Sequence, residues 1–244
     1  SKGVIQQSLS ASILPKSEGL EVLLETTFGP LKMNIISKES GFILDNIAIK
    51  NDSLLVTGAV ELIKKIDQLH NYSTTVDALL KSQNTKALME EFGFQGILSS
   101  KNLTIDLNLI WPYIPSSDGV FDANGTVKVN IKDGQITAID PIAGKVLGLL
   151  SIAELPKRLV LDFSDIFKKG LSFNRLSAEF QFKNGNAYTC NFVMEGTSVD
   201  IIMVGGTDMI AETYNQLAIV RPLLSDALPM SGAAFGGPGV AAAV

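Results

Sequence analysis

Apolar and polar residues alternate along much of the chain with a period of two. Between residues 103 and 111 the odd positions are apolar, and Thr104, Asp106 and Asn108 separate them. The apolar positions are Leu103, Ile105, Leu107, Leu109 and Trp111. Successive side chains of a β-strand point to opposite faces, so this pattern predicts a strand with one apolar face. Pro112 should end it, because proline lacks a backbone N–H.

Two dipeptides between alternating segments predict hairpins. Asp133-Gly134 follows a segment with Val127, Val129 and Ile131 on one face. Asn184-Gly185 lies between two further segments, whose alternate residues are Ala178, Phe180 and Phe182 before it and Tyr188, Cys190, Phe192 and Met194 after it. Such pairs suit the type I′ turn, which requires positive φ at both central residues.

Turn residues separate the other predicted strands. Gly29-Pro30, Ser40-Gly41 and Asn51-Asp52 interrupt the first third, and Gly196-Thr197 precedes a strand that Gly205-Gly206 should end. The predicted strands are 22–28, 31–36, 42–49, 54–62 and 72–80, then one with Val199, Ile201 and Met203, and one with Leu217 and Ile219 ended by Pro222. The sequence therefore predicts a mainly β protein built as a long antiparallel meander.

Helices should be few and short. Asn84 can cap a helix over 85–92, with Gly93 just past its end. Two further short helices are expected at 142–150 and 164–169. So little helix cannot cover a long sheet, whose apolar face must still be covered. A closed barrel, a sandwich and an open half-pipe filled by a ligand all satisfy the pattern.

Composition narrows the function classes. Hydrophobic residues make up 46% of the 244 residues and charged residues 18%, compared with about 25% in typical soluble domains. The net charge of −5 comes without a basic cluster, which excludes nucleic acid as a partner. The segment from 230 to 244 is uncharged but shorter than the ~20 residues that span a bilayer. The start at Ser1, without a signal-like segment, predicts a fragment of a longer protein.

Catalytic and metal-binding residues are sparse. His70 is the single histidine and lies in a polar stretch without a catalytic motif. Cys190 is the single cysteine, and its alternation with Tyr188 and Phe192 predicts an inward-facing small hydrophobe. One cysteine and one histidine do not make a structural zinc site. We therefore expect that the protein is not an enzyme and that it has no catalytic residues, no metal site and no cofactor.

The second half of the sequence resembles a known family. The stretch DGQITAIDPIAGKVLGLLSIAELPKRLVLDFSDIFKKGLSF (133–173) resembles the C-terminal region of the YhdP family, large AsmA-like proteins of the bacterial envelope. The resemblance continues through FKNGNAYTCNFVMEG (182–196) and VGGTDMIAETYNQLAIVRP (204–222) and ends in LPMSGAAFGGPGVAAAV (228–244). Upstream it rests on the order of elements and on LNLIWP (107–112).

This resemblance implies a fold, a function and a location. The fold would be an antiparallel meander curled into an open groove or half-barrel, with a few short helices. The function would be a segment of a bridge-like lipid-transfer protein that moves phospholipid between inner and outer membrane. The chain would be a periplasmic portion of an inner-membrane-anchored protein, with its C-terminus toward the outer membrane. The alternative is an envelope assembly scaffold, or protein-interaction module, that pairs an exposed strand edge with an envelope protein partner in outer-membrane biogenesis.

We expect residues 1–244 to be a single fragment of the larger protein. Its parts would be an upstream meander (1–81), a short helix (82–95), the family-like groove (96–222) and the start of a hydrophobic C-terminal segment (223–244). An acyl chain leaving a bilayer exposes CH₂ groups at about 0.8 kcal/mol each, which an apolar groove would offset. The predicted lipid-contacting residues are Leu103, Ile105, Leu107, Leu109, Val127, Val129, Ile131, Phe180, Phe182, Tyr188 and Phe192.

Overall fold

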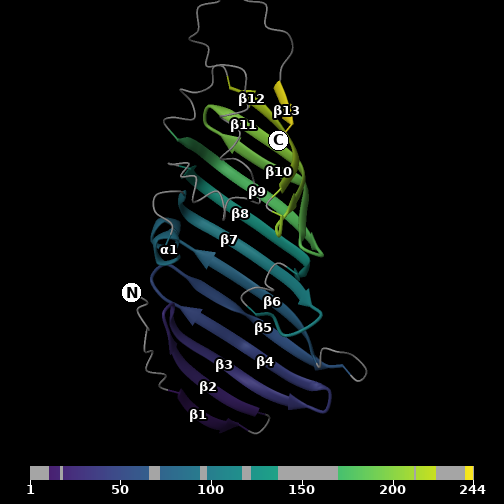
Figure 1. The fold of residues 1–244 in the computed structure, drawn as a ribbon. Coiled ribbons are helices and arrows are strands. Elements are labelled where there is room, and N and C mark those ends of the chain that lie inside the picture. Colours follow the sequence, from purple (N-terminus) through teal and green to yellow (C-terminus); the bar gives the residue numbers. More distant parts are fainter. Residues whose placement is uncertain are drawn as a thin grey trace, which may run out of the picture.

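The computed structural model describes residues 11–16, 19–65, 72–93, 98–116, 122–136, 170–211, 213–223 and 240–243. They form one antiparallel sheet of thirteen strands, in which each strand pairs with its neighbours in sequence (Figure 1). The strands are β1 (Ala11–Lys16), β2 (Gly19–Thr26), β3 (Gly29–Lys38), β4 (Gly41–Lys50), β5 (Leu55–Lys64), β6 (Tyr72–Ser82), β7 (Leu98–Trp111), β8 (Asn124–Ile136), β9 (Leu171–Lys183), β10 (Asn186–Gly196), β11 (Val199–Asp208), β12 (Thr213–Pro222) and β13 (Val240–Ala243). The predicted long meander is confirmed.

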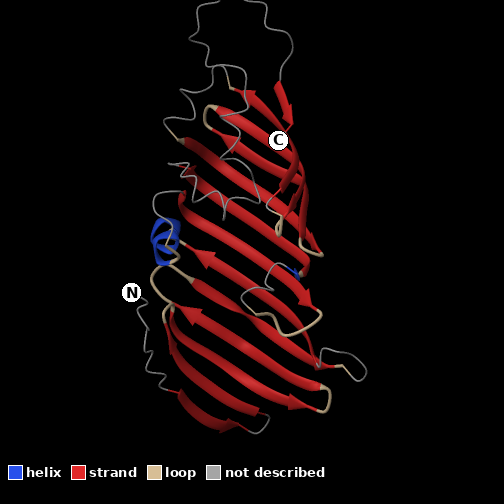
Figure 2. Ribbon diagram, in the orientation of Figure 1, coloured by secondary structure: helices blue, strands red, loops and turns tan. Residues whose placement is uncertain are grey.

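The sheet is open. β1 and β13 are its two edges, and among the described strands they do not pair with each other. The strands cross the long axis of the molecule diagonally, and those near the C-terminal end curl out of the plane of the others (Figures 1 and 2). Of the three architectures that satisfied the pattern, the structure has the open groove or half-barrel.

One short α-helix, α1 (Thr85–Glu91), precedes β7 (Figure 2). The described part of the chain contains no other α-helix. The Asn84 side chain accepts a hydrogen bond from the Ala87 N–H at 3.2 Å, which satisfies a donor of the first turn. Leu88 is buried in the core, and the Ser53 hydroxyl donates to the Glu91 carboxylate at 2.7 Å. The predicted capped helix is confirmed. The helices predicted at 142–150 and 164–169 lie outside the described residues.

β7 ends where the sequence predicted, at Trp111 before Pro112. The segment that follows is tied to its neighbours, because the Thr74 hydroxyl donates to the Tyr113 carbonyl at 2.9 Å. The Tyr113 hydroxyl in turn donates to the Asp122 carboxylate, and this hydrogen bond raises the pKa of Tyr113. The phenol therefore stays protonated, and keeps its donor role, to a higher pH than an ordinary tyrosine.

The two predicted hairpins have different outcomes. Asn184 and Gly185 connect β9 to β10 with φ values of 50° and 77°, so this hairpin is confirmed. The hairpin at Asp133-Gly134 is wrong, because β8 continues through it. Gly134 pairs with Ser100 on one side and with Phe173 on the other. A Cβ on Gly134 would lie 2.4 Å from the Phe173 ring, so the glycine makes room for a side chain rather than for a turn.

Asp133 belongs to a distortion shared by three strands. Consecutive exposed residues occur in β7, β8 and β9, and the ladder aligns them. They are Lys101-Asn102, Lys132-Asp133 and Asn174-Arg175. On the two sides of each pair, the buried residues alternate in opposite phase. In β7, for example, Ser100 before the pair and Leu103 after it are both buried, three positions apart instead of two. Because the three strands change phase together, the register between them is retained.

The strand end predicted at Gly205-Gly206 is also wrong, since β11 extends to Asp208. Gly205 has a φ of 129°, and a Cβ there would lie 2.3 Å from the Asn215 carbonyl oxygen of β12. A conformation of this kind favours glycine. The glycine therefore permits a close approach of two strands and does not terminate one.

Candidate lipid-contacting face

The register of the sheet joins apolar residues into rows that run across the strands. In the longest row, one residue from each strand between β2 and β9 is the direct partner of the next. The row consists of Leu24, Leu31, Ile49, Val56, Leu80, Ile105, Val129 and Ala178. Partners in neighbouring strands lie on the same face with Cβ atoms about 5 Å apart. The eight residues therefore form an uninterrupted apolar track, which we call the central row.

Two further rows lie on the same face, one on each side of the central row. The first consists of Ile47, Gly58, Ala78, Leu107, Val127 and Phe180. The second continues into the last strands and consists of Leu103, Ile131, Leu176, Met194, Ile201 and Val220. One face of the sheet is thus apolar from β2 to β12, and we call it the apolar face.

Exposure changes along this face. Met194, Ile201 and Met203 near the C-terminal end are fully buried, with 0% of their surface exposed. Leu80 and Val129, in the middle of the central row, are only partly buried. Apolar side chains that keep an exposed part can contact a ligand, whereas fully buried ones act as core. The central strands therefore offer the accessible part of the apolar face.

The structure places the predicted lining residues on the apolar face, except Tyr188. Five of them are buried: Leu103, Val127, Ile131, Phe180 and Phe192. Another five are partly buried: Ile105, Leu107, Leu109, Val129 and Phe182. Alternation within each strand was enough to group these residues, because β7 and β8 keep one phase over this stretch.

Tyr188 lies on the opposite face, so its predicted inward placement is wrong. It pairs with Gln181 and is 50% exposed. β10 has one more residue than β9 between Tyr188 and Val193, which is a β-bulge. Cys190 and Asn191 are both exposed at this bulge, so the inward placement of Cys190 is wrong as well. The bulge reverses the phase of the strand, and Phe192 returns to the apolar face.

The upstream members of the central row were not predicted as lining residues. In β4 the alternation is broken between Leu44 and Ile47, where the register shifts against both neighbouring strands. Asn46 lies in this irregular segment with a φ of 50°. The sequence alone did not assign Ile49 to a face, and its pairing with Leu31 and Val56 does so.

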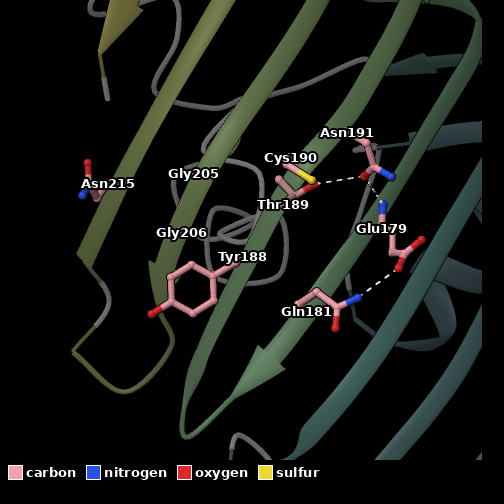
Figure 3. Close-up of a pocket in the computed structure, with 9 residues that line it drawn as sticks. All are labelled: Glu179, Gln181, Tyr188, Thr189, Cys190, Asn191, Gly205, Gly206 and Asn215. Carbon is pink, nitrogen blue, oxygen red and sulfur yellow. Dashed lines mark hydrogen bonds between the residues drawn. The ribbon is translucent and has the colours of Figure 1, made fainter.

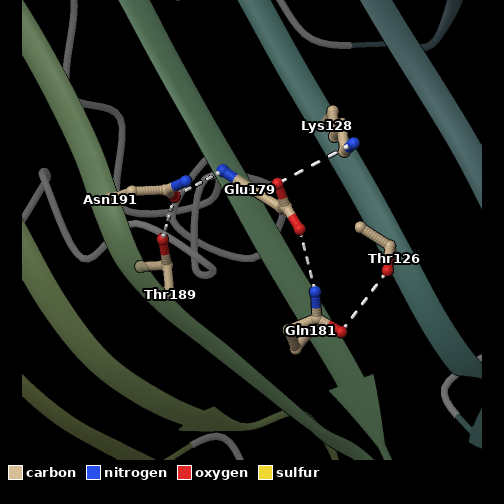
Figure 4. Close-up of polar contacts among 6 residues, drawn as sticks. All are labelled: Thr126, Lys128, Glu179, Gln181, Thr189 and Asn191. Atoms are coloured by element: carbon tan, nitrogen blue, oxygen red, sulfur yellow. Dashed lines mark hydrogen bonds and ion pairs between the residues drawn. The ribbon is translucent and has the colours of Figure 1, made fainter.

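The opposite face carries polar side chains over the same strands. Lys128 forms an ion pair with Glu179 at 3.9 Å, and the Thr126 hydroxyl donates to Gln181 at 3.3 Å (Figure 4). Asn108 donates to the Asp77 carboxylate. The central sheet is therefore amphipathic, with one face suited to hydrocarbon and the other to water.

No group of three potential metal ligands gathers anywhere in the described ranges. Within the same ranges, no helix has the length and apolar character needed to cross a membrane. His70 lies outside the described residues. The described side chains thus assemble no metal centre, and the extended feature of the sheet is its apolar face.

Comparison with known proteins identifies the family. Residues 22–244 match the family described as "YhdP protein". The chain belongs to the YhdP family. The predicted family is therefore confirmed over most of the sequence.

The curated relatives include the "Intermembrane phospholipid transporter YhdP" of Escherichia coli (strain K12), which is 29% identical over 175 residues. The match covers 71% of this chain and 14% of the relative, so the chain spans a small part of that relative's length. The relative is named a transporter, and the intermembrane role in that name agrees with an envelope location. No solved structure matches the chain.

Proposed function

We propose that this chain is one segment of a conduit that carries phospholipid between the inner and the outer membrane. The observation that carries the proposal is the central row, which crosses eight strands on the apolar face without a polar interruption. The name of the E. coli relative supports phospholipid as the cargo. The segment would lie in the periplasm and act without catalysis, with its C-terminus toward the outer membrane.

The energetics of such a conduit follow from the dimensions of the sheet. Neighbouring strands lie about 4.8 Å apart, so the seven steps from β2 to β9 measure about 34 Å. The hydrocarbon core of a whole bilayer is about 30 Å thick. The central row is therefore longer than one acyl chain and could hold two in file. Each CH₂ covered by the row avoids about 0.8 kcal/mol of exposure to water.

The same face provides little to retain a lipid at one position. Its central residues are aliphatic, and the polar groups of β7 and β8 point to the other side of the sheet. Contacts of this type depend on area and not on direction, so they change little as a chain moves from one strand to the next. The phospholipid headgroup would remain in water beside the open groove.

Photocrosslinking in cells tests this function with neighbouring residues as controls. A photoreactive side chain at Val129 would lie in the central row, and one at Lys128 would lie on the opposite face. Ile105 and Asp106 give a second pair on β7. Phe180 is a poorer site because it is buried, and a probe there would disturb packing. We expect phospholipid adducts at Val129 and Ile105 and none at their controls. Equal labelling within each pair would contradict the proposal.

The open edges of the sheet favour one other function. The outward sides of β1 and β13 have no strand partner among the described residues, and such edges can accept a strand from another protein. An assembly scaffold would use these edges and would not need the central row. Prolines on outward-facing N–H groups of both β1 and β13 would then abolish function in cells. Retained function after both substitutions, with lipid adducts at Val129, would exclude the scaffold.

A further inference from the structure

A depression of about 420 Å³ lies on the polar face, over β9 to β12 (Figure 3). Four residues cross its floor as successive partners in the ladder: Gln181, Tyr188, Gly206 and Asn215. A Cβ on Gly206 would lie 2.7 Å from the Tyr188 ring, so the ring packs directly on the backbone of β11. An aromatic ring thus lies between two amide side chains.

Hydrogen bonds hold the polar groups of one wall in place (Figure 4). The Gln181 side-chain amide donates to the Glu179 carboxylate at 2.9 Å, and the Glu179 backbone N–H donates to the side-chain oxygen of Asn191 at 2.9 Å. The Asn191 side-chain oxygen also accepts from the Thr189 hydroxyl at 3.4 Å, and among the described residues no group accepts from its NH₂ group. Groups fixed in this way lose little conformational entropy when a ligand binds.

Other groups of the depression face solvent. Within the part of the chain that the structure describes, neither the Tyr188 hydroxyl nor the side-chain amide of Asn215 has a hydrogen-bond partner. Half of the Tyr188 surface is exposed. The depression thus presents donors, acceptors and an aromatic ring to the same volume (Figure 3).

The charges of the residues that line the depression indicate which class of ligand it could bind. No lysine, arginine or histidine is among the described residues that line the depression, and anions such as phosphate are bound mainly by such cations. Lys128 lies outside the lining, and its ammonium is 3.9 Å from the Glu179 carboxylate, so these two opposite charges offset each other. An acyl chain over this lining would cover the Tyr188 hydroxyl and the Asn215 side-chain amide without giving them hydrogen bonds, which costs free energy. The remaining chemistry is a neutral ligand with hydroxyl groups and a flat C–H surface.

We propose that this depression binds a neutral carbohydrate. A sugar ring would lie with its C–H face on Tyr188, while Gln181, Asn191 and Asn215 exchange hydrogen bonds with its hydroxyl groups. The site goes beyond the conduit function, because it lies on the face opposite the central row. A lipid on the apolar face and a sugar in the depression could therefore be bound together.

Titration of the purified full-length protein with two neutral probes tests the site. The probes are the trimer of N-acetylglucosamine and maltotriose, followed by saturation-transfer NMR and calorimetry. We expect saturable binding of at least one probe and a loss of about tenfold or more in affinity for Tyr188→Ala. Tyr188→Phe keeps the ring and should lose less than Tyr188→Ala. Asn130→Ala, which lies on the same face of β8 outside the depression, should bind like the unmodified protein.

Two results would overturn the proposal: no binding of either sugar, or binding that Tyr188→Ala leaves unchanged. Tyr188 is an exposed side chain, so its removal should not unfold the sheet, and a thermal unfolding curve checks this. Lipid crosslinking at Val129 in the same Tyr188→Ala variant separates the two proposals. If crosslinking persists while sugar binding is absent from all forms of the protein, only the carbohydrate site fails.

Discussion

Cys190 and Asn191 are neighbours in sequence whose side chains leave β10 on the same side of the sheet. An ideal strand would send them to opposite faces, and the bulge prevents this. As a result Tyr188 contributes to the polar depression and Phe192 to the core, although both occupy even positions. A single inserted residue thus determines the face of the sheet on which each side chain lies, and therefore which ligand it can contact.

The bulge makes a prediction about the cysteine. In the folded protein, Cys190 should react with a maleimide within about tenfold of its rate in the unfolded chain, because it is exposed. As the control, Met203→Cys in a Cys190→Ser background places a thiol at a fully buried position. That thiol should react more than ~1000-fold slower than in the unfolded chain, since it requires opening of the core. Mass spectrometry over time measures both rates. A protected Cys190 would argue against the bulge.

Glycines provide a second test at the scale of single residues. Gly125 has a φ of 132°, and a Cβ there would lie 2.1 Å from the Asn108 carbonyl oxygen. Gly93 has a φ of 82° but no atom within 4 Å of the Cβ position. Gly93→Ala should therefore lower the free energy of unfolding by about 1 kcal/mol, from backbone strain alone. Gly125→Ala should cost about 1–3 kcal/mol more, because a clash is added. Urea denaturation compares the two, and equal losses would contradict the close contact.

At the scale of elements, α1 packs on the sheet through few side chains. Leu88 is 2% exposed and belongs to the main core, whereas Lys86 on the same helix is exposed. The Ser53 and Asn51 side chains also bond to Glu91, which ties the turn between β4 and β5 to the end of the helix. A helix of seven residues is not stable by itself, so these contacts hold it.

Substitutions in α1 should show this dependence. Leu88→Ala should lower the free energy of unfolding by about 2–5 kcal/mol, because it leaves a cavity in the core. Lys86→Ala should change it by less than about 0.5 kcal/mol, as an exposed substitution. Denaturation midpoints in urea measure both. A similar small effect of the two variants would mean that the helix does not support the sheet.

At the scale of the whole molecule, the continuity of the rows on the apolar face matters more for contact with a lipid than any single residue in them. Each row takes one residue from each strand, so its continuity depends on the register of every neighbouring pair. The phase change shared by β7, β8 and β9 preserves that register. The bulges in β4 and β10 return apolar side chains to the apolar face where strict alternation would point them to the other side. The apolar face is a property of the assembled sheet.

A charge placed in a row should interrupt transport, whereas the same charge on the other face should not. Leu107 and Asn108 are neighbours on β7 with opposite orientation. Leu107→Lys would raise the free energy of an acyl chain at that strand by about 3 kcal/mol. This increase would slow the passage of lipid about a hundredfold. Asn108→Lys lies beside Asp77 on the polar face and should be tolerated. Phospholipid that co-purifies with the full-length protein, and outer-membrane lipid balance in cells, provide the measurements. Equal effects of the two variants would contradict the conduit.

The sequence by itself determined the class and the local elements. Alternation located the strands, the Asn184-Gly185 hairpin and the apolar side of β7, and the capping residue located α1. These features depend on contacts between near neighbours or on the two-residue period of a strand, and both are present in the sequence. The family also followed from residues that can be read directly.

The tertiary structure decided the faces and the site. Asp133-Gly134 and Gly205-Gly206 have the composition of turns, but the strands continue through them because partners on both sides complete the ladder. The bulge at Cys190 placed Tyr188 on the polar face, and only pairing across strands joined Leu24 to Ala178 in one row. A one-residue change of register moves every later side chain to the other face, and the energy that fixes register comes from residues distant in sequence.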